Sequence, residues 1–164
     1  MRLLRHSVFA LLALGLVAGA AAGADLDKLR QKLAREPDPA NRAKITVEIG
    51  DELLKQAARK FKDAANAEAE SILLEYRKAV HKAYDDLVET GRDARRKPKG
   101  FKHLEIHLRQ SRRRLDDMAR PLPYEDRRPI EETIKDLEEL RLKLLGDLMQ
   151  EDRKGSNGPE RKPQ

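Results

Sequence analysis

The sequence predicts an all-α protein, a bundle of about five helices arranged as antiparallel hairpins, and three observations lead to this prediction. Apolar residues recur at steps of three and four, which places them on one side of a helix. All eight prolines lie at or between the ends of the proposed helices or in the C-terminal tail. No segment shows the alternation of β-branched residues that is typical of a strand. The five expected helices are residues 26–35, 39–62, 67–90, 101–119 and 129–152.

The boundary between the first two helices is set by the sequence Pro37-Asp38-Pro39. Residues 26–35 place three leucines on one face, and Pro37 ends that pattern. Asp38 is a suitable N-cap for the second helix, because its carboxylate can accept a hydrogen bond from a free backbone N–H. Proline fits the first helical position, where a missing N–H costs nothing. The second helix is therefore expected to start at Pro39.

The helical pattern from residue 39 to residue 90 is expected to form two helices that pair with each other. Residues 63–66 carry no large apolar side chain, and one uninterrupted helix would be long for a compact domain, so we expect a break there. Gly91 follows the third helix where a C-terminal glycine cap belongs. Gly50, inside the second helix, either allows a neighbour to approach closely or is a tolerated local weakness.

Residues 101–120 have the cleanest helical pattern in the chain. Ser111 is the one interruption in an apolar stripe that consists of Phe101, Leu104, Leu108, Leu115 and Met118. Pro121 prevents the helix from continuing. The fifth helix starts at Pro129 and has acidic residues in its first turn, where the helix dipole favours negative charge. We expect helices four and five to form a second hairpin.

The N-terminal residues 1–24 have the three-part organisation of a secretory signal peptide. Arg2 and Arg5 precede a run without charge, in which an apolar core is followed by small residues. The sequence Ala22-Gly23-Ala24 fits the A-x-A cleavage pattern, so cleavage is expected after Ala24. An uncleaved signal anchor is the alternative, but the apolar core is short for a membrane span of about 20 residues. We therefore expect an exported protein, either periplasmic or secreted.

Composition limits what the mature chain can be. Loss of Arg2 and Arg5 from the 35 basic residues leaves 33 against 29 acidic ones, a net charge of +4 that is too small for a dedicated nucleic-acid binder. The chain has no cysteine, so an exported form has no disulfide and must be stabilised by packing. We expect a single helical domain over residues 25–152 and a disordered tail over residues 153–164, which has no apolar residue.

Part of the chain resembles one hairpin of the tetratricopeptide repeats. The resemblance covers Leu53 to Val80 and consists of an alternation of small and large residues at Ala57, Phe61, Ala69, Tyr76 and Ala79. The spacing departs from the family pattern, and no second copy appears 34 residues further on. The resemblance implies a helical hairpin of similar build, as in exported all-α bacterial proteins with such hairpins, and it transfers no binding residue. The chain is also similar in length and charge to small basic periplasmic chaperones, but it lacks their strand segments.

His103 and His107 form an H-x-x-x-H pair, in which two imidazoles one helical turn apart can share a zinc or copper ion. A site needs further ligands, and no acidic residue lies three or four positions from either histidine. The intervening sequence also lacks the glutamate of the H-E-x-x-H motif. A weak metal- or pH-responsive sensor is an alternative hypothesis. The structural interpretation places both histidines on the surface, and we expect no metal and no cofactor.

Residues 92–128 hold 13 basic residues against six acidic ones, a net charge of +7. The functional interpretation is attraction to an anionic partner such as a phospholipid surface or an acidic protein. Nucleic acid is disfavoured because interleaved aromatic residues are missing. The structural interpretation is neutralisation by the acidic fifth helix, which carries Glu131, Glu132, Asp136, Glu138 and Glu139. The candidate residues for an anionic partner are Arg95, Arg96, Lys97, Lys99, Lys102, Arg109, Arg112, Arg113 and Arg114.

No residue pattern indicates catalysis. The sequence has no cysteine nucleophile, no glycine-rich phosphate loop and no serine in a nucleophile elbow. Acidic pairs such as Asp116-Asp117 are adjacent, so on a helix they diverge by about 100°. The sequence therefore predicts a non-enzymatic exported protein of the bacterial cell envelope that acts as a scaffold, an adaptor or a chaperone-like binder. The expected partner is another envelope protein or a second copy of the chain.

Overall fold

The computed structural model describes residues 17–149, with side chains from Asp25 onward, and this part of the chain is all-α. Its elements are α1 (Val17–Arg35), α2 (Pro39–Lys62), α3 (Asn66–Glu89), α4 (Lys99–Ala119), the 3₁₀ turn η1 (Tyr124–Asp126) and α5 (Arg128–Met149). No strand occurs among these residues. The predicted fold class is confirmed, and each of the five expected helices is present in the described range.

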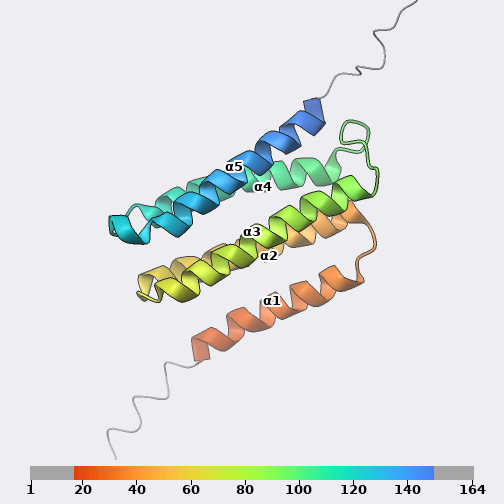
Figure 1. Cartoon of the computed structure of the whole chain (residues 1–164). Coiled ribbons are helices and arrows are strands. Elements are labelled where there is room, and N and C mark those ends of the chain that lie inside the picture. Colours follow the sequence, from red (N-terminus) through yellow and green to blue (C-terminus); the bar gives the residue numbers. More distant parts are fainter. Residues whose placement is uncertain (1–16, 150–164) are drawn as a thin grey trace, which may run out of the picture.

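The helices form three layers, with the α2–α3 hairpin between α1 on one side and the α4–α5 hairpin on the other (Figure 1). The two hairpins stack with their first helices, α2 and α4, in contact and their second helices, α3 and α5, in contact. Gly100 of α4 lies against Ala40 at the start of α2, and Arg114 further along α4 pairs with Asp51, so α2 and α4 run parallel. The pairings of α2 with α3 and of α4 with α5 are as expected.

Helix boundaries follow the local chemistry that the sequence indicated. The Asp38 carboxylate accepts a hydrogen bond from the backbone N–H of Asn41 at 2.9 Å, as expected for an N-cap. The chain turns after α2, where Ala64 has a φ of 55°, and Gly91 after α3 has a φ of 63°. Glycine adopts this left-handed conformation without the steric cost that a Cβ imposes, which explains its place at the end of α3.

Helices α3 and α5 each start one residue before the predicted position, and the starts of α1 and α4 differ by more. The backbone of α1 begins at Val17, nine residues before the expected start, because the preceding sequence is rich in alanine, the strongest helix former. Helix α4 begins at Lys99 and includes Gly100, where a Cβ would lie 2.5 Å from a methyl carbon of Leu87. Residues 1–16 of the expected signal peptide and the expected tail lie outside the described residues, and cleavage after Ala24 stays a prediction.

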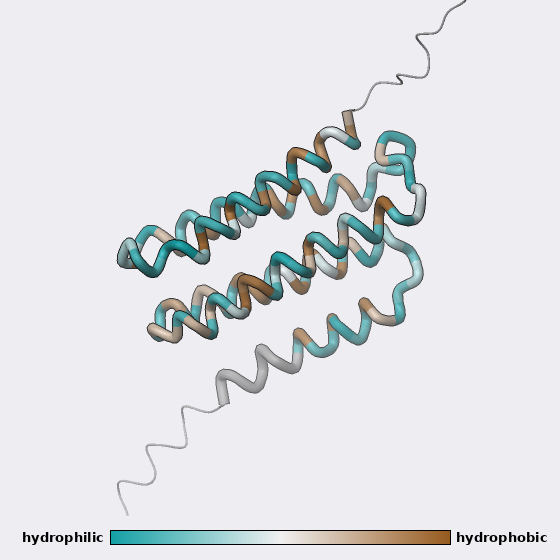
Figure 2. Tube along the Cα trace, in the orientation of Figure 1, coloured by the Kyte–Doolittle hydropathy of each residue, from teal (hydrophilic) through white to brown (hydrophobic). Residues whose placement is uncertain are grey.

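One continuous hydrophobic core connects all five helices, and leucine and alanine supply most of it. Tyr76 and Phe101 are the largest fully buried side chains. Figure 2 shows short hydrophobic bands recurring among hydrophilic residues along each helix, as expected where one face is buried. Within the described range, no helix combines the length and the apolar character needed to cross a membrane.

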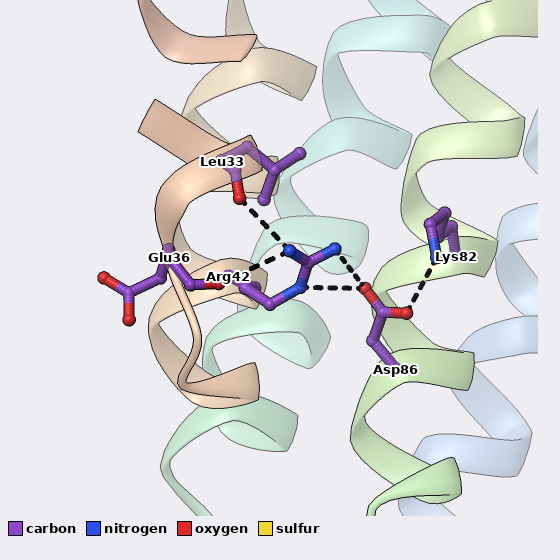
Figure 3. A network of polar contacts seen from close by, with 5 residues as sticks. All are labelled: Leu33, Glu36, Arg42, Lys82 and Asp86. Carbon is purple, nitrogen blue, oxygen red and sulfur yellow. Dashed lines mark hydrogen bonds and ion pairs between the residues drawn. The ribbon is translucent and has the colours of Figure 1, made fainter. Parts of the chain in front are cut away.

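Arg42 of α2 fastens α1 to the central hairpin (Figure 3). Its guanidinium donates to the backbone carbonyl of Leu33 at 3.1 Å and to that of Glu36 at 3.4 Å, which adds donors for carbonyl groups at the end of α1. On its other side it donates twice to the carboxylate of Asp86 in α3, at 2.9 and 3.1 Å. Burial acts to raise the pKa of Asp86, but hydrogen bonds from Lys82 and Arg42 outweigh it and hold that pKa below its ordinary value.

Candidate functional site

A polar network lies inside the bundle where α2, α3 and α4 meet, and His107 of α4 is its centre. His107 is only 2% exposed, so the expectation that both histidines are surface residues is wrong for this one. The ring fits because Gly50 of α2 leaves space for it. A Cβ on Gly50 would lie 2.8 Å from Nε2 of His107 and 2.9 Å from the ring of Tyr76. Gly50 is therefore a close-approach position, one of its two predicted roles.

Both ring nitrogens of His107 have polar neighbours. Nε2 lies 3.1 Å from the hydroxyl of Tyr76 in α3 and 3.3 Å from Oγ of Ser111 in α4. Nδ1 lies 3.6 Å from Oδ1 of Asp51 in α2. The carboxylate beside Nδ1 favours the tautomer with hydrogen on Nδ1, so that Nε2 accepts the hydrogen bond from the Tyr76 hydroxyl. One side chain thus joins three helices. These four residues are called the buried histidine network below.

Burial controls the protonation of the buried histidine network. It lowers the pKa of His107 to about 4; the carboxylate of Asp51 opposes this shift, and the guanidinium of Arg114 adds to it. Burial also raises the pKa of the Tyr76 hydroxyl, and the hydrogen bond with Ser111 offsets that shift only in part. Both side chains are therefore neutral at pH 7.

Ser111 contacts His107, and His107 contacts Asp51, as in a serine–histidine–acid triad. A substrate cannot reach these residues in this structure. Ser111 is 0% exposed, and Tyr76 already contacts the His107 nitrogen that would serve as the base. A nucleophile needs open space beside it for the reacting atom of the substrate. The geometry therefore supports helix packing.

His103 does not join His107 in a metal site. His103 is half-buried, and its Nδ1 is buried without a hydrogen-bond partner among the residues that the structure describes. Both nitrogens of His107 face the other members of the buried histidine network. Over residues 17–149, no group of three histidine, cysteine or acidic residues is placed to hold a metal ion.

The basic region is neutralised at some candidate positions. Arg112 pairs with Glu138 of α5 at 3.0 Å, which is the contact between α4 and the acidic helix that the structural interpretation expected. Arg114 pairs instead with Asp51 of α2 at 2.5 Å. In the loop before α4, Asp93 accepts hydrogen bonds from the backbone N–H groups of Arg95 and Arg96, and its carboxylate lies within ion-pair distance of both side chains.

The acidic helix α5 does not neutralise α4 along its whole length. Asp136 faces α3, where its carboxylate contacts Arg77 at 3.1 Å and His81 at 2.9 Å. Glu132 pairs with Arg128 of its own helix. Among the residues that the structure describes, five candidates are exposed and have no ion-pair partner, namely Lys97, Lys99, Lys102, Arg109 and Arg113.

Two of these free cations belong to an arginine-lined hollow between α4 and α5. The hollow has a volume of about 230 Å³, and Arg109, Arg112, Arg113 and Arg141 lie around it, together with Glu138 and Asp116. Arg141 is held by Glu105 at 2.8 Å, whereas Arg109 and Arg113 have no ion pair in the described part of the chain. The hollow therefore keeps an excess of positive charge.

An apolar groove of about 610 Å³ lies between the C-terminal halves of α2 and α4. Its apolar walls are Leu54, Ala58 and Phe61 on one side and Met118, Pro121 and Leu122 on the other. Its rim carries Lys55, Lys62, Arg114 and Asp117. The groove is open to solvent, since α1 packs on a different side of α2 (Figure 1). We call it the apolar groove.

The apolar groove was not predicted, although the sequence of α2 contains a signal for it. Leu54 and Ala58 widen the apolar face of α2 beyond the stripe that runs from Ile45 to Phe61. A wide apolar face indicates that more than one neighbour packs on a helix. It does not tell which part of that face stays uncovered.

Comparison with known proteins finds no match: no protein-family model fits the chain, and neither the curated proteins nor the solved structures contain a similar one.

Proposed function

We propose that this chain is a non-enzymatic, exported helical protein of the bacterial cell envelope that acts by protein–protein interaction, as a scaffold, an adaptor or a chaperone-like binder. The observation that carries the proposal is the apolar groove, because a hollow lined mainly by apolar side chains between two helices is a recurring binding surface for an amphipathic segment of another protein. The charged N-terminus followed by an uncharged apolar run supports export.

Site-specific photo-crosslinking in cells tests this function. A photoreactive residue replaces Ala58 in the groove, and the matched control carries it at Lys78, which is exposed on α3. We expect crosslinks to a defined protein from Ala58 and none from Lys78, together with a mature N-terminus at Asp25 in the envelope fraction. Equal crosslinking from both positions, or recovery of the intact chain only from the cytosol, would contradict the proposal.

A second candidate function is peripheral binding of anionic envelope components through the basic region, residues 92–128. The arginine-lined hollow favours it, because Arg109 and Arg113 are exposed there without an intramolecular partner. Guanidinium groups bind phosphate oxygens through two parallel hydrogen bonds, so a phosphorylated headgroup fits the chemistry.

Sedimentation with phosphatidylglycerol vesicles at low and high salt tests this second function. Binding at low salt should weaken at high salt, because the contact is electrostatic. The double variant Arg109→Gln/Arg113→Gln should lose it. The control Arg96→Gln removes a cation that already pairs with Asp93, and it should retain binding. Absence of binding by the unaltered protein at both salt concentrations eliminates this function.

A further inference from the structure

The apolar groove has the dimensions needed to bind one helix. Its α2 wall consists of Leu54, Ala58 and Phe61, which are spaced four and three residues apart, and its α4 wall includes Arg114 and Met118, four residues apart. Seven residues of helix span about 10 Å, or two turns. The α2 wall is thus a helical ridge two turns long, and the α4 side adds about one helical turn followed by Pro121 and Leu122 beyond the helix end. Ridges of this kind pack against the side chains of a third helix.

The open form of the groove favours a helix over a small molecule. A small-molecule site encloses most of its ligand, commonly 70–90% of the ligand surface. The apolar groove has no cover in the described part of the chain, because it lies between two parallel helices and opens to solvent. A helix that lies in a groove buries only its apolar face and keeps its polar face in water.

The two rims of the groove differ in free charge. On the α4 rim, Arg114 pairs with Asp51 and Asp117 pairs with Arg120, so both charges have partners. On the α2 side, Lys55 pairs with Glu52.

Lys62 on the α2 rim and Arg59 one turn earlier are exposed, and neither has an ion pair within the described range. Positive charge without an intramolecular partner is therefore concentrated along the end of α2. A carboxylate of a bound partner can contact it without breaking an existing ion pair.

We propose that the apolar groove binds the apolar face of an amphipathic α-helix from a partner protein, and that the flank of this helix beside α2 is acidic. The inference rests on the proposed function and names the chemistry of the partner. Apolar side chains at positions i, i+3 or i+4 and i+7 of the partner fill the two turns between α2 and α4. Its glutamate or aspartate residues face Arg59 and Lys62. Charge complementarity of this kind fixes the orientation of the bound helix.

Fluorescence anisotropy with two synthetic peptides tests the inference on the whole mature protein. Both peptides are about 18 residues long, because shorter isolated helices are marginally stable in water. They share leucines at i, i+3, i+4 and i+7, and they differ in having glutamate or lysine on the flanks. We expect the glutamate peptide to bind at least about tenfold more tightly than the lysine peptide at low salt, and the preference to shrink at high salt.

Variants then locate the binding. Ala58→Arg fills the centre of the groove and should abolish binding of the glutamate peptide. Because this substitution could disturb packing, the charge-reversal variant Arg59→Glu/Lys62→Glu provides a second measurement on exposed residues, and it should reverse the preference in favour of the lysine peptide. The control Lys78→Glu changes the same charge on α3 and should retain the original preference.

Equal affinity for both peptides, or unchanged binding by Ala58→Arg, overturns the inference. A long-chain fatty acid serves as a competing probe. If the groove binds the fatty acid and neither peptide, the inference is also overturned. The proposed function fails in a different way. If Ala58 crosslinks a protein in cells and the glutamate peptide does not bind, the function stands and the acidic-helix inference falls. If the glutamate peptide binds and no crosslink forms in the envelope, the groove binds an acidic helix as inferred and the proposed envelope function falls.

Discussion

Replacement of His107 by glutamine is predicted to remove part of the acid sensitivity of folding. The folded protein holds the pKa of His107 at about 4, because the ring is buried, against 6.5 for an unperturbed histidine. Between these two values the unfolded chain binds a proton that the folded chain does not bind. Stability therefore falls as the pH is lowered through this window. Linkage gives a loss of about 2 kcal/mol between pH 7.5 and pH 5 from this one residue.

Urea unfolding at several pH values measures this loss. Glutamine cannot be protonated, so the free energy of unfolding of His107→Gln should fall by about 2 kcal/mol less than that of the unaltered protein between pH 7.5 and pH 5. All other titrating groups cancel in this difference. The control Leu115→Ala loses stability through a cavity in the same helix and should keep the original pH dependence. Equal pH dependence of His107→Gln and the unaltered protein would refute the reasoning.

Two further predictions concern packing and the attachment of α1, and thermal unfolding with hydrogen exchange checks them. Gly50→Ala should destabilise the protein by about 1–3 kcal/mol, because the added Cβ would lie 2.8 Å from the buried imidazole. Gly146→Ala, where nothing lies within 4 Å of the added Cβ, should stabilise the protein by about 1 kcal/mol. A stability change of the same sign in both variants would contradict the geometry. Arg42→Met should lower stability by about 1–3 kcal/mol and speed amide exchange in α1, because the carboxylate of Asp86 loses two of its hydrogen bonds and the carbonyls of Leu33 and Glu36 each lose one. The exposed Lys82→Met should change stability by less than about 1 kcal/mol, and a similar effect of both substitutions would show that Arg42 does not fasten α1.

The helix boundaries could be predicted from the sequence because neighbouring residues decide them. Asp38 and Pro39 start α2 through an N-cap and a proline that needs no N–H partner, and Gly91 ends α3 with a positive φ. Each of these effects acts within a few residues of the chain, so it is visible in a short window of sequence. The pairing of consecutive helices followed from the short connections between them.

The partners of polar residues could not be predicted, because periodicity gives the angle of a residue around its helix and not the neighbour it meets. Asp136 was expected to help neutralise α4, but it faces Arg77 and His81 of α3. His107 lies at the edge of the apolar stripe of α4, and its burial depends on Gly50, 57 residues away in the sequence. Contacts of this range require the stacking of the two hairpins, which no local pattern specifies.

Arg114 connects the buried histidine network with the apolar groove, and its ion pair decides whether binding and acid sensitivity are coupled. Its guanidinium lines the groove and pairs with Asp51, whose carboxylate lies 3.6 Å from Nδ1 of His107. A partner carboxylate on the α4 side would compete with Asp51, whereas one beside α2 meets Arg59 and Lys62, which have no ion pair to break in the described structure.

The acidic flank of a bound helix therefore belongs on the α2 side, where it leaves Asp51 and the buried histidine network undisturbed. It follows that the glutamate peptide should bind with the same affinity to His107→Gln as to the unaltered protein at pH 7.5. Charge reversal at the α2 rim should likewise leave the pH dependence of unfolding between pH 7.5 and pH 5 unchanged. Anisotropy and urea unfolding measure the two quantities separately. A change in the affinity would mean that the partner helix contacts Arg114, and a change in the pH dependence would mean that the α2 rim acts on the buried histidine network. Either result would show that the network and the groove act as one site.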